Sequence, residues 1–312
     1  MNCTGNKGAI SDRNPPFGGY GSPMDHIEWL SEPEMSNPIL VIAFEGWNDA
    51  GDAATTAANY IARRWDADEF ATLDPEPFYD FSSNRPMVRL DEHHVRRLEW
   101  PANSFSHLRL DDGRDVVVLT GVEPRLRWRT FCEQITGIAT RVDASLVITL
   151  GALLAEVHHA NPIEVVGSSS DPALAESLGL HPSRYEGPTG IVGVLHQALG
   201  QMSTPTMSLW ASVPTYVPSS TSPKAALALV ERLANVLAVP LAATDLHIAS
   251  SSYERQIDDL LSDDEELAEY AAQILLDALD DEPEEDSSEQ SDAEVDPEAL
   301  IEELEQYLRD NG

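Results

Sequence analysis

The stretch FEGWNDAGDAA, residues 44–54, holds the side chains of this sequence that could most readily do chemistry. Glu45, Asp49 and Asp52 supply carboxylates and Asn48 supplies an amide, close to two glycines. We expect the stretch to join the end of a buried strand to the start of a helix. Ligands of α/β proteins bind at this edge of the sheet, and the free N–H groups of a first helical turn favour an anion there.

Other features of the same stretch favour a structural role. It lacks the G-x-G-x-x-G pattern of dinucleotide-binding loops and the Lys-Ser/Thr pair of a P-loop. Carboxylates at a helix start would repel a phosphate, and Asn and Asp are also ordinary turn and N-cap residues. We therefore favour a structural or subunit-contact role over a catalytic one, with Trp47 as an apolar anchor and Asp49 as an exposed turn carboxylate.

A second candidate loop is YEGPTGI, residues 185–191. Pro188 fixes a turn, Thr189 can cap a helix, and Gly187 and Gly190 permit close approach of the backbone. The loop can therefore be a pocket wall, or it can simply lead into a helix that begins near Ile191. The residues that we predict to bind a partner or a ligand through the two loops are Glu45, Gly46, Trp47, Asn48, Asp49, Gly51, Asp52, Tyr185, Glu186, Gly187, Pro188, Thr189 and Gly190.

Backbone freedom is expected to matter at Gly46 and Gly187. Turns of this kind often need backbone angles that a β-branched residue cannot adopt. We expect valine at either position to damage folding or assembly more than loss of the Asp49 carboxylate does.

No other part of the sequence predicts a catalytic residue, a cofactor or a metal site. The serines at 168–170 lack the second glycine of a nucleophile elbow, and Cys132 lies within an expected helix as a small buried hydrophobe. The histidine pairs at 93–94 and 158–159 are adjacent in sequence, so in a strand they point to opposite faces and cannot readily share one metal. We expect Trp210 to pack in the core or at the sheet edge.

Charge excludes some classes of partner. The chain has 54 acidic against 19 basic residues, and 24 of the acids but only two arginines follow residue 253. Its only lysines are Lys7 and Lys224. Because nucleic acids and anionic membranes are bound through Lys and Arg, we expect neither as a partner.

Apolar content and cysteine number indicate the compartment. Hydrophobic residues make up 42% of the chain, but no apolar run approaches the ~20 residues of a membrane-spanning helix, and the start lacks the apolar run of a secretory signal. Two cysteines cannot form a disulfide framework or a thiolate metal cluster. We expect a cytoplasmic protein.

Hydrophobic periodicity alternates between strands and helices, which predicts an α/β fold with a mostly parallel sheet covered by helices. Between residues 70 and 110 short alternating segments with Pro predict an antiparallel excursion. The expected strands are 39–44, 116–120, 146–150, 163–166 and 206–213, and the expected helices are 50–65, 128–142, 173–178, 191–202 and 223–238.

Composition divides the chain into four parts. We expect a disordered leader at 1–24, the α/β domain at 25–245, an acidic helical extension at 246–280, and a disordered acidic tail at 281–312. Within the tail, Pro297 opens a short amphipathic helix whose spacing fits a hydrophobic groove on a partner, or on the chain's own body. Its apolar face consists of Leu300, Leu304, Tyr307 and Leu308.

An ordered set of motifs resembles a known family. FEGWNDAGDAA, SFSHLR, ITLG, YEGPTGI, and LWASVPTYV leading into SPKAALALVERL follow one another over roughly residues 25–260 as in the proteasome assembly chaperone two family in its actinobacterial form. The resemblance implies a fold similar to nucleoside phosphorylases and related hydrolases, and self-association into rings such as trimers. In eukaryotic and archaeal relatives it implies binding to proteasome α-subunits.

Two features depart from what such relatives suggest. Some have been labelled ATP-grasp ligases, but that chemistry needs a Gly-rich loop, lysines and metal-binding carboxylates, and this body has only Lys224. Chaperones and activators of this system often end in a hydrophobic residue, a Tyr and one last residue, whereas Tyr307 and Leu308 are followed by residues 309–312. Docking through a terminal carboxylate is therefore not expected.

The leading hypothesis is a non-catalytic homo-oligomer of the assembly-chaperone type, whose acidic C-terminal segment recruits or regulates a partner. Its expected partners are further copies of itself and proteasome subunits. An alternative is an enzyme that acts on a small anionic or nucleoside-like molecule between the two loops. A third is an oligomeric scaffold without a proteasome connection. A deep pocket lined by both loops with convergent charged groups would favour the enzyme.

Overall fold

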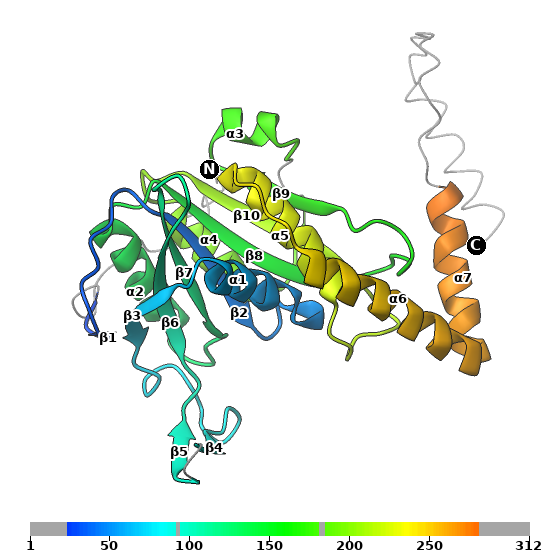
Figure 1. The fold of residues 1–312 in the computed structure, drawn as a ribbon, viewed down its shortest axis with the longest axis horizontal. Helices are drawn as coiled ribbons and strands as arrows, with labels where there is room; N and C mark the ends of the chain where they lie inside the picture. Colours follow the sequence, from blue (N-terminus) through cyan, green and yellow to red (C-terminus); the bar gives the residue numbers. More distant parts are fainter. Residues whose placement is uncertain (1–23, 92–93, 181–184, 281–312) are drawn as a thin grey trace, which may run out of the picture. The chain divides into compact units, whose positions relative to one another are not determined.

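The computed structural model describes residues 24–91, 94–180 and 185–280. By its internal contacts the chain divides into two units, 1–275 and 276–312, and the account below concerns the first. Among the described residues eight strands form one sheet in the order β1-β3-β6-β7-β2-β8-β10-β9 (Figure 1). These strands are β1 (Ile27–Trp29), β2 (Ile39–Glu45), β3 (Asp68–Leu73), β6 (Asn103–Arg109), β7 (Asp115–Val122), β8 (Leu146–Ala155), β9 (Val165–Ser169) and β10 (Thr206–Pro214).

The centre of the sheet is parallel, and its strands are apolar on both faces. β2 pairs in parallel with β7 and β8, and β8 pairs in parallel with β10. β2 reads ILVIAFE, and five of its seven residues are buried, which is the composition of a strand covered on both sides. The carboxyl ends of the four central strands therefore meet at one edge.

Antiparallel strands flank this centre on both sides. β7 pairs with β6, β6 with β3 and β3 with β1, while β9 runs antiparallel to β10 at the other edge. The predicted α/β class is confirmed, and the antiparallel excursion occupies one side of the sheet. We predicted no strand at β1, because a three-residue strand carries too little periodicity.

Helices cover both faces of the sheet (Figure 1). α1 (Ala53–Arg64) and α5 (Pro223–Leu237) pack on one face against the side chains of Val41, Ile148 and Leu209. α2 (Trp128–Arg141) and α4 (Ile191–Leu199) pack on the other, where Phe44 contacts Phe131. Further helices are η1 (Ala50–Asp52), a 3₁₀ turn, and α3 (Pro172–Ser177), α6 (Thr244–Asp263) and α7 (Glu265–Asp280).

The sequence of each covering helix explains its position. α1 presents small alanines to the sheet, and α5 begins at Pro223 after Ser222, whose side chain caps it by accepting from Ala225 N–H at 3.2 Å. Cys132 in α2 is fully buried, as expected, and burial raises the pKa of its thiol to about 12. The thiol therefore stays protonated at neutral pH.

A separate two-stranded hairpin, β4 (Met87–Leu90) and β5 (Arg96–Glu99), projects beyond the large sheet (Figure 1). α6 and the start of α7 bury a cluster of their own with Tyr216, Val217, Tyr253, Ile257, Ala271 and Ile274. Within the described residues no helix is both long and apolar enough to cross a membrane.

Some expectations fall on residues outside the described ranges. They are nearly all of the leader at 1–24, the first histidine of the pair at 93–94, and the acidic tail at 281–312. The tail includes the expected helix from Pro297 and its face of Leu300, Leu304, Tyr307 and Leu308. These expectations stay predictions.

Candidate functional site

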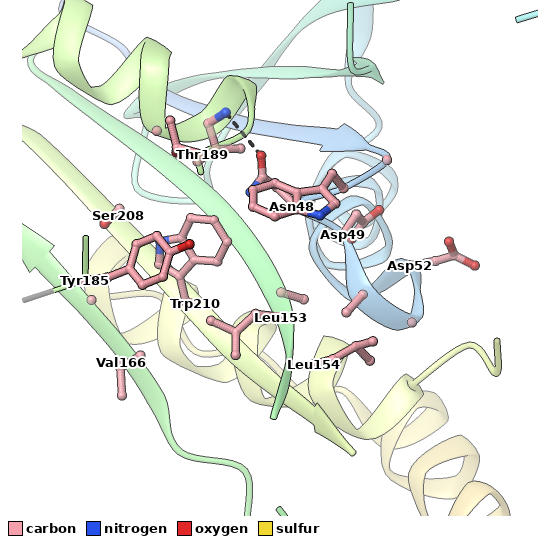
Figure 2. A pocket seen from close by; sticks show the side chains of 18 of the residues that line it. Asn48, Asp49, Asp52, Leu153, Leu154, Val166, Tyr185, Thr189, Ser208 and Trp210 are labelled. Carbon is pink, nitrogen blue, oxygen red and sulfur yellow. Dashed lines mark hydrogen bonds between the residues drawn. The ribbon is translucent and has the colours of Figure 1, made fainter. Parts of the chain in front are cut away.

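A groove of about 1180 Å³ lies at the carboxyl edge of the central strands, and both predicted loops line it (Figure 2). The first loop contributes residues 46–52 and the second contributes Tyr185, Pro188 and Thr189. The ends of β8, β9 and β10 and the start of α4 complete the walls. These parts add Ala152, Leu153, Leu154, Val166, Gly167, Ser168, Val192, Gly193, His196, Ser208, Trp210 and residues 218–220.

The first loop is held by backbone contacts to the neighbouring strand ends. Gly46 has a φ of 127°, which only glycine adopts readily, so the chain turns sharply as β2 ends. The N–H of Ala152 on β8 donates to the carbonyl of Asn48 at 2.8 Å. The loop therefore continues the sheet edge as a fixed part of the fold.

Asp49 is not the exposed turn carboxylate that we predicted. Its side chain is only 5% exposed, and Oδ1 accepts from the N–H groups of Ala54 (2.7 Å) and Thr55 (3.2 Å) while Oδ2 accepts from the Thr55 hydroxyl. The carboxylate thus caps the start of α1, which is why the chain buries it. Burial nonetheless raises the pKa of Asp49 to about 6.

The second loop rests directly on the first. The N–H of Val192 donates to Asn48 Oδ1 at 3.4 Å, and a Cβ added at Gly190 would lie on that same oxygen and 2.9 Å from the Trp47 ring. Glycine at 190 is therefore required by close approach. Gly187 is different, since an added Cβ would meet only the end of the exposed Tyr185 ring, so the constraint that we expected at Gly187 is absent.

Glu123, just after β7, ties the two loops together. Its Oε2 accepts from the Trp47 N–H at 3.3 Å, and its Oε1 accepts from the Ile191 N–H at 2.9 Å. One carboxylate thus holds both the turn after β2 and the first turn of α4, whose N–H groups have no acceptor within the helix. Sequence reasoning did not identify Glu123 as the residue that links the two loops.

The mouth of the groove is apolar and exposed. The side chain of Trp47 is 62% exposed, and Leu153, Leu154, Val166 and Tyr185 are also exposed. We call these five residues the rim. Large apolar side chains that are exposed next to one another mark binding surfaces.

Electrostatics make the groove unsuited to anions. Among its described lining residues none is Lys or Arg, and the charged groups are Asp49 and Asp52. Burial lowers the pKa of His196, which therefore stays neutral at pH 7. Beside the groove, burial and the nearby Asp52 charge raise the pKa of Glu45. A bound phosphate or carboxylate would meet negative charge and no cation from these residues.

Comparison with known proteins identifies the family. A family model described as the PAC2 family matches residues 43–261. The chain belongs to the PAC2 family. The resemblance drawn from the motifs is thereby confirmed, whereas no curated protein matches the chain.

Solved structures agree with this PAC2 assignment. A PAC2 family protein from Streptomyces avermitilis is 44% identical with a TM-score of 0.70, and the match spans 75% of this chain and 99% of that protein. A proteasome-assembly chaperone homologue from Mycobacterium tuberculosis is 43% identical with a TM-score of 0.67, and the match spans 74% of this chain and 99% of that protein. A proteasome activator from Pyrococcus furiosus, 17% identical with a TM-score of 0.63 over 75% of this chain and 97% of its own, shares the fold.

The sequence found only part of the PAC2 groove. Glu45, Glu186, Gly187 and Gly190 from the predicted set do not line it, whereas the other predicted loop residues do. Trp210 lines the groove as well as packing on Gly151, where an added Cβ would meet its ring at 2.5 Å. Leu153 and Leu154 were missed because they extend β8 beyond the apolar run from which we predicted a strand ending at 150.

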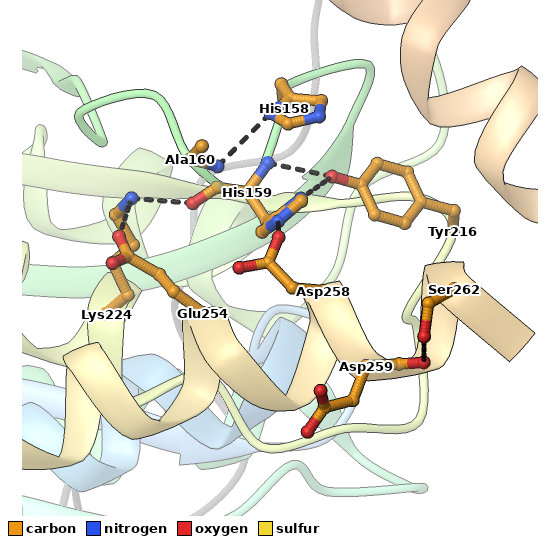
Figure 3. A network of polar contacts seen from close by, with 9 residues as sticks. All are labelled: His158, His159, Ala160, Tyr216, Lys224, Glu254, Asp258, Asp259 and Ser262. Carbon is orange, nitrogen blue, oxygen red and sulfur yellow. Dashed lines mark hydrogen bonds and ion pairs between the residues drawn. The ribbon is translucent and has the colours of Figure 1, made fainter.

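The adjacent histidines at 158–159 take part in a polar network that fixes α6 (Figure 3). His159 is buried, its N–H donates to the Tyr216 hydroxyl at 2.7 Å, and its Nε2 lies 3.0 Å from Asp258 of α6. Lys224 pairs with Glu254 of α6 and donates to the His159 carbonyl at 2.6 Å. In the described part of the chain no three His, Cys, Asp or Glu side chains are grouped to hold a metal.

Proposed function

We propose that this PAC2 family chain is a non-catalytic scaffold of the proteasome-assembly-chaperone type, which self-associates and binds proteasome subunits through the groove rim. The observation that carries the proposal is the rim itself. Its five large apolar side chains are exposed around a groove whose loop backbone is held by hydrogen bonds. Protein interfaces are built around such aromatic and aliphatic anchors.

The carboxylates of the site support the same proposal. Asp49 caps α1 and Glu123 holds both loops, so each is committed to stabilising the fold. A general acid or base needs a proton that it can exchange with substrate. The 43% identical M. tuberculosis relative is described as a proteasome-assembly chaperone homologue, and we extend that description to this chain.

The test is assembly of proteasome subunits from the same organism, with and without this chain. We expect co-expressed α- and β-subunits to reach complete particles faster with the chain, and native mass spectrometry to detect the chain on α-subunit intermediates. The double variant Trp47→Ser/Leu154→Ser should lose both effects. Leu30→Ser, which removes a residue that is 59% exposed and does not line the groove, is the matched control. An unchanged assembly rate and no complex with the wild-type chain would refute the proposal.

The groove also supports a second candidate function, an enzyme or receptor for a neutral nucleoside-like molecule. Its volume, its position at the strand ends, and the Trp210 and Tyr185 rings fit a heterocycle. The absence of Lys and Arg among the described lining residues argues against the anionic substrates that we had also considered. Thermal-shift titration with adenosine, uridine and their monophosphates tests this candidate. Saturable stabilisation by a nucleoside that Trp210→Ala abolishes would place this function above the scaffold.

A further inference from the structure

Exposed arginines are concentrated around the start of α2. Three of them alternate along residues 125–129, and a fourth follows Asn84, whose Oδ1 accepts from Arg125 Nε at 3.2 Å. All four are exposed, and the side chain of Leu126 among them is 48% exposed. We call this surface the arginine patch, and its residues are Arg85, Arg125, Leu126, Arg127 and Arg129. In a chain with 54 acidic and 19 basic residues the patch is a local excess of positive charge.

The arginine patch is not neutralised by the part of the chain that the structure describes. None of its arginines forms an ion pair there, whereas the arginines that do pair with a carboxylate are Arg89, Arg97, Arg109, Arg114 and Arg141. Asp80 lies close enough to Arg125 to feel its charge, but it accepts from the Ser82 N–H at 2.9 Å and hydroxyl at 2.6 Å. Glu133 follows Arg129 by one turn of α2 and forms no ion pair with it. The positive charge is therefore available to another molecule.

Arginine at the start of α2 weakens the fold. Arg127 directly precedes the helix with a φ of 52°, a left-handed conformation that favours Gly or Asn, and its side chain does not cap α2. Arg127 and Arg129 also place positive charge at the positive end of the helix dipole, where the first turn contains no acid. Residues that break several folding rules at one place mark functional positions.

The backbone beneath the arginine patch is fixed. The N–H groups of Arg125 and Leu126 both donate to the Phe78 carbonyl, at 2.9 Å and 3.0 Å, and Phe78 is itself fully buried. The indole N–H of Trp128 donates to the Pro124 carbonyl at 2.7 Å. A surface whose backbone is already ordered loses less conformational entropy when a partner binds.

The chemistry of the patch indicates what it binds. Carboxylates match the donor geometry of arginine side chains, and Leu126 offers an apolar contact among them. A nucleic acid would continue past the patch over a chain whose net charge is −35, which would repel it. A short acidic segment contacts the patch alone, because charges farther than about 10 Å away are largely screened at 0.1 M salt.

We propose that the arginine patch binds an acidic segment of a protein partner, whose carboxylates pair with the arginines while an apolar side chain packs on Leu126. None of the patch residues lines the groove, so this is a second surface beside the groove rim. The proposal therefore goes beyond the proposed function and does not depend on it.

Fluorescence anisotropy with defined peptides tests the proposal on the full chain. The probe is a fluorescein-labelled peptide of four Glu-Glu-Leu repeats. We expect saturable binding at about 20 mM salt that weakens about tenfold at about 200 mM, because salt screens the charge pairs. A peptide of four Glu-Glu-Ser repeats carries the same charge and should bind at least about threefold more weakly, because it cannot bury an apolar side chain on Leu126.

The variant Arg127→Asn/Arg129→Glu separates binding from folding. Asn tolerates the left-handed backbone and caps a helix, and Glu suits the start of the dipole, so this variant should have a higher urea midpoint but bind the leucine peptide at least about tenfold more weakly. Arg63→Asn/Arg64→Glu is the matched control, since it changes the charge equally at the exposed end of α1. It should lower the urea midpoint and leave the peptide affinity within about twofold of wild type.

Four outcomes would overturn this inference. They are no saturable binding of the leucine peptide by the wild-type chain, equal affinity of the two double variants, equal binding of the leucine and serine peptides, and equally tight binding of a twelve-nucleotide single-stranded DNA. Trp47→Ser/Leu154→Ser distinguishes this surface from the groove rim and should bind the peptide as the wild type does. Loss of binding in that variant would place the peptide at the rim and would also overturn the inference.

Discussion

The N–H of Ile191 donates to the Glu123 carboxylate at 2.9 Å and so joins the first turn of α4 to the end of β7. The other oxygen of that carboxylate accepts from the Trp47 N–H at 3.3 Å, so two donors that lie 144 residues apart in sequence share one acceptor. The position of Trp47 at the rim, and of α4 beside it, therefore depends on a side chain that does not itself line the groove.

We expect Glu123→Ala to destabilise the fold and to loosen both loops. It leaves the part-buried Ile191 N–H without its acceptor, which costs about 1–3 kcal/mol in the free energy of unfolding, whereas water can replace the exposed contact to the Trp47 N–H. Glu123→Gln keeps one acceptor oxygen and should cost less. Urea unfolding measures the stability and hydrogen exchange at Trp47 and Ile191 measures the loosening. Glu186→Ala, an exposed carboxylate in the second loop, is the control, and an equal effect of both alanine variants would contradict the role given to Glu123.

Burial of Asp49 should make stability depend on pH in a defined direction. The pKa of this carboxyl is about 6 in the folded chain, whereas it is about 4 in an unfolded chain, so the folded state binds the proton more tightly. Between about pH 4 and pH 6 the contribution of Asp49 to stability therefore falls as pH rises, and it is constant above that range.

Substitution of Asp49 isolates this effect. Asp49→Asn keeps an oxygen that can accept from the Ala54 and Thr55 N–H groups, so we expect it to remove this pH dependence and to match or exceed wild-type stability at pH 7. Asp49→Ala loses the cap and should cost about 1–2 kcal/mol. Urea midpoints over about pH 4–8 measure both. Asp111→Asn, at an exposed site in the turn before β7, is the control, and an unchanged pH profile in Asp49→Asn would refute the assignment.

The sequence was sufficient for the central strands and covering helices because each carries its own periodicity. β2 and α5 were predicted to within two residues, since a buried apolar run and a Pro after a Ser cap are local signals. The groove was only partly predictable. Its loops show in their glycines and turn residues, but the Glu123 contacts and the burial of Asp49 depend on which segments the fold brings together.

The Tyr216 hydroxyl should be important for holding α6. It accepts from the buried His159 N–H, lies 2.8 Å from His159 Nδ1, and burial raises the pKa of Tyr216 to about 12. Tyr216→Phe leaves that N–H unpaired and should cost about 1–3 kcal/mol. We expect faster hydrogen exchange in α6 and earlier proteolytic cleavage there.

Tyr270→Phe is the matched control for this network. Tyr270 contacts Thr215 at 3.3 Å but is 42% exposed, so water can replace the lost contact. Its stability and the exchange of α6 should stay close to wild type. Equal exchange of α6 in both phenylalanine variants would show that the network does not hold this helix.

Alanine should destabilise the fold at one glycine of the second loop and leave its stability nearly unchanged at another. At Gly190 the added Cβ would lie on Asn48 Oδ1 and 2.9 Å from the Trp47 ring, both parts of the fixed first loop. One of the loops must then shift, and the hydrogen bond from Val192 to Asn48 is lost, so we expect a cost of about 1–3 kcal/mol. At Gly187 the Cβ would meet the hydroxyl end of the exposed Tyr185, whose 3.0 Å hydrogen bond to the Pro188 carbonyl water can replace, so the change should be within about 0.5 kcal/mol. Thermal and urea unfolding of both variants compare the costs, and hydrogen exchange at the Trp47 amide should quicken only in Gly190→Ala. A larger loss in Gly187→Ala would mean that the second loop packs elsewhere than on Asn48 and Trp47.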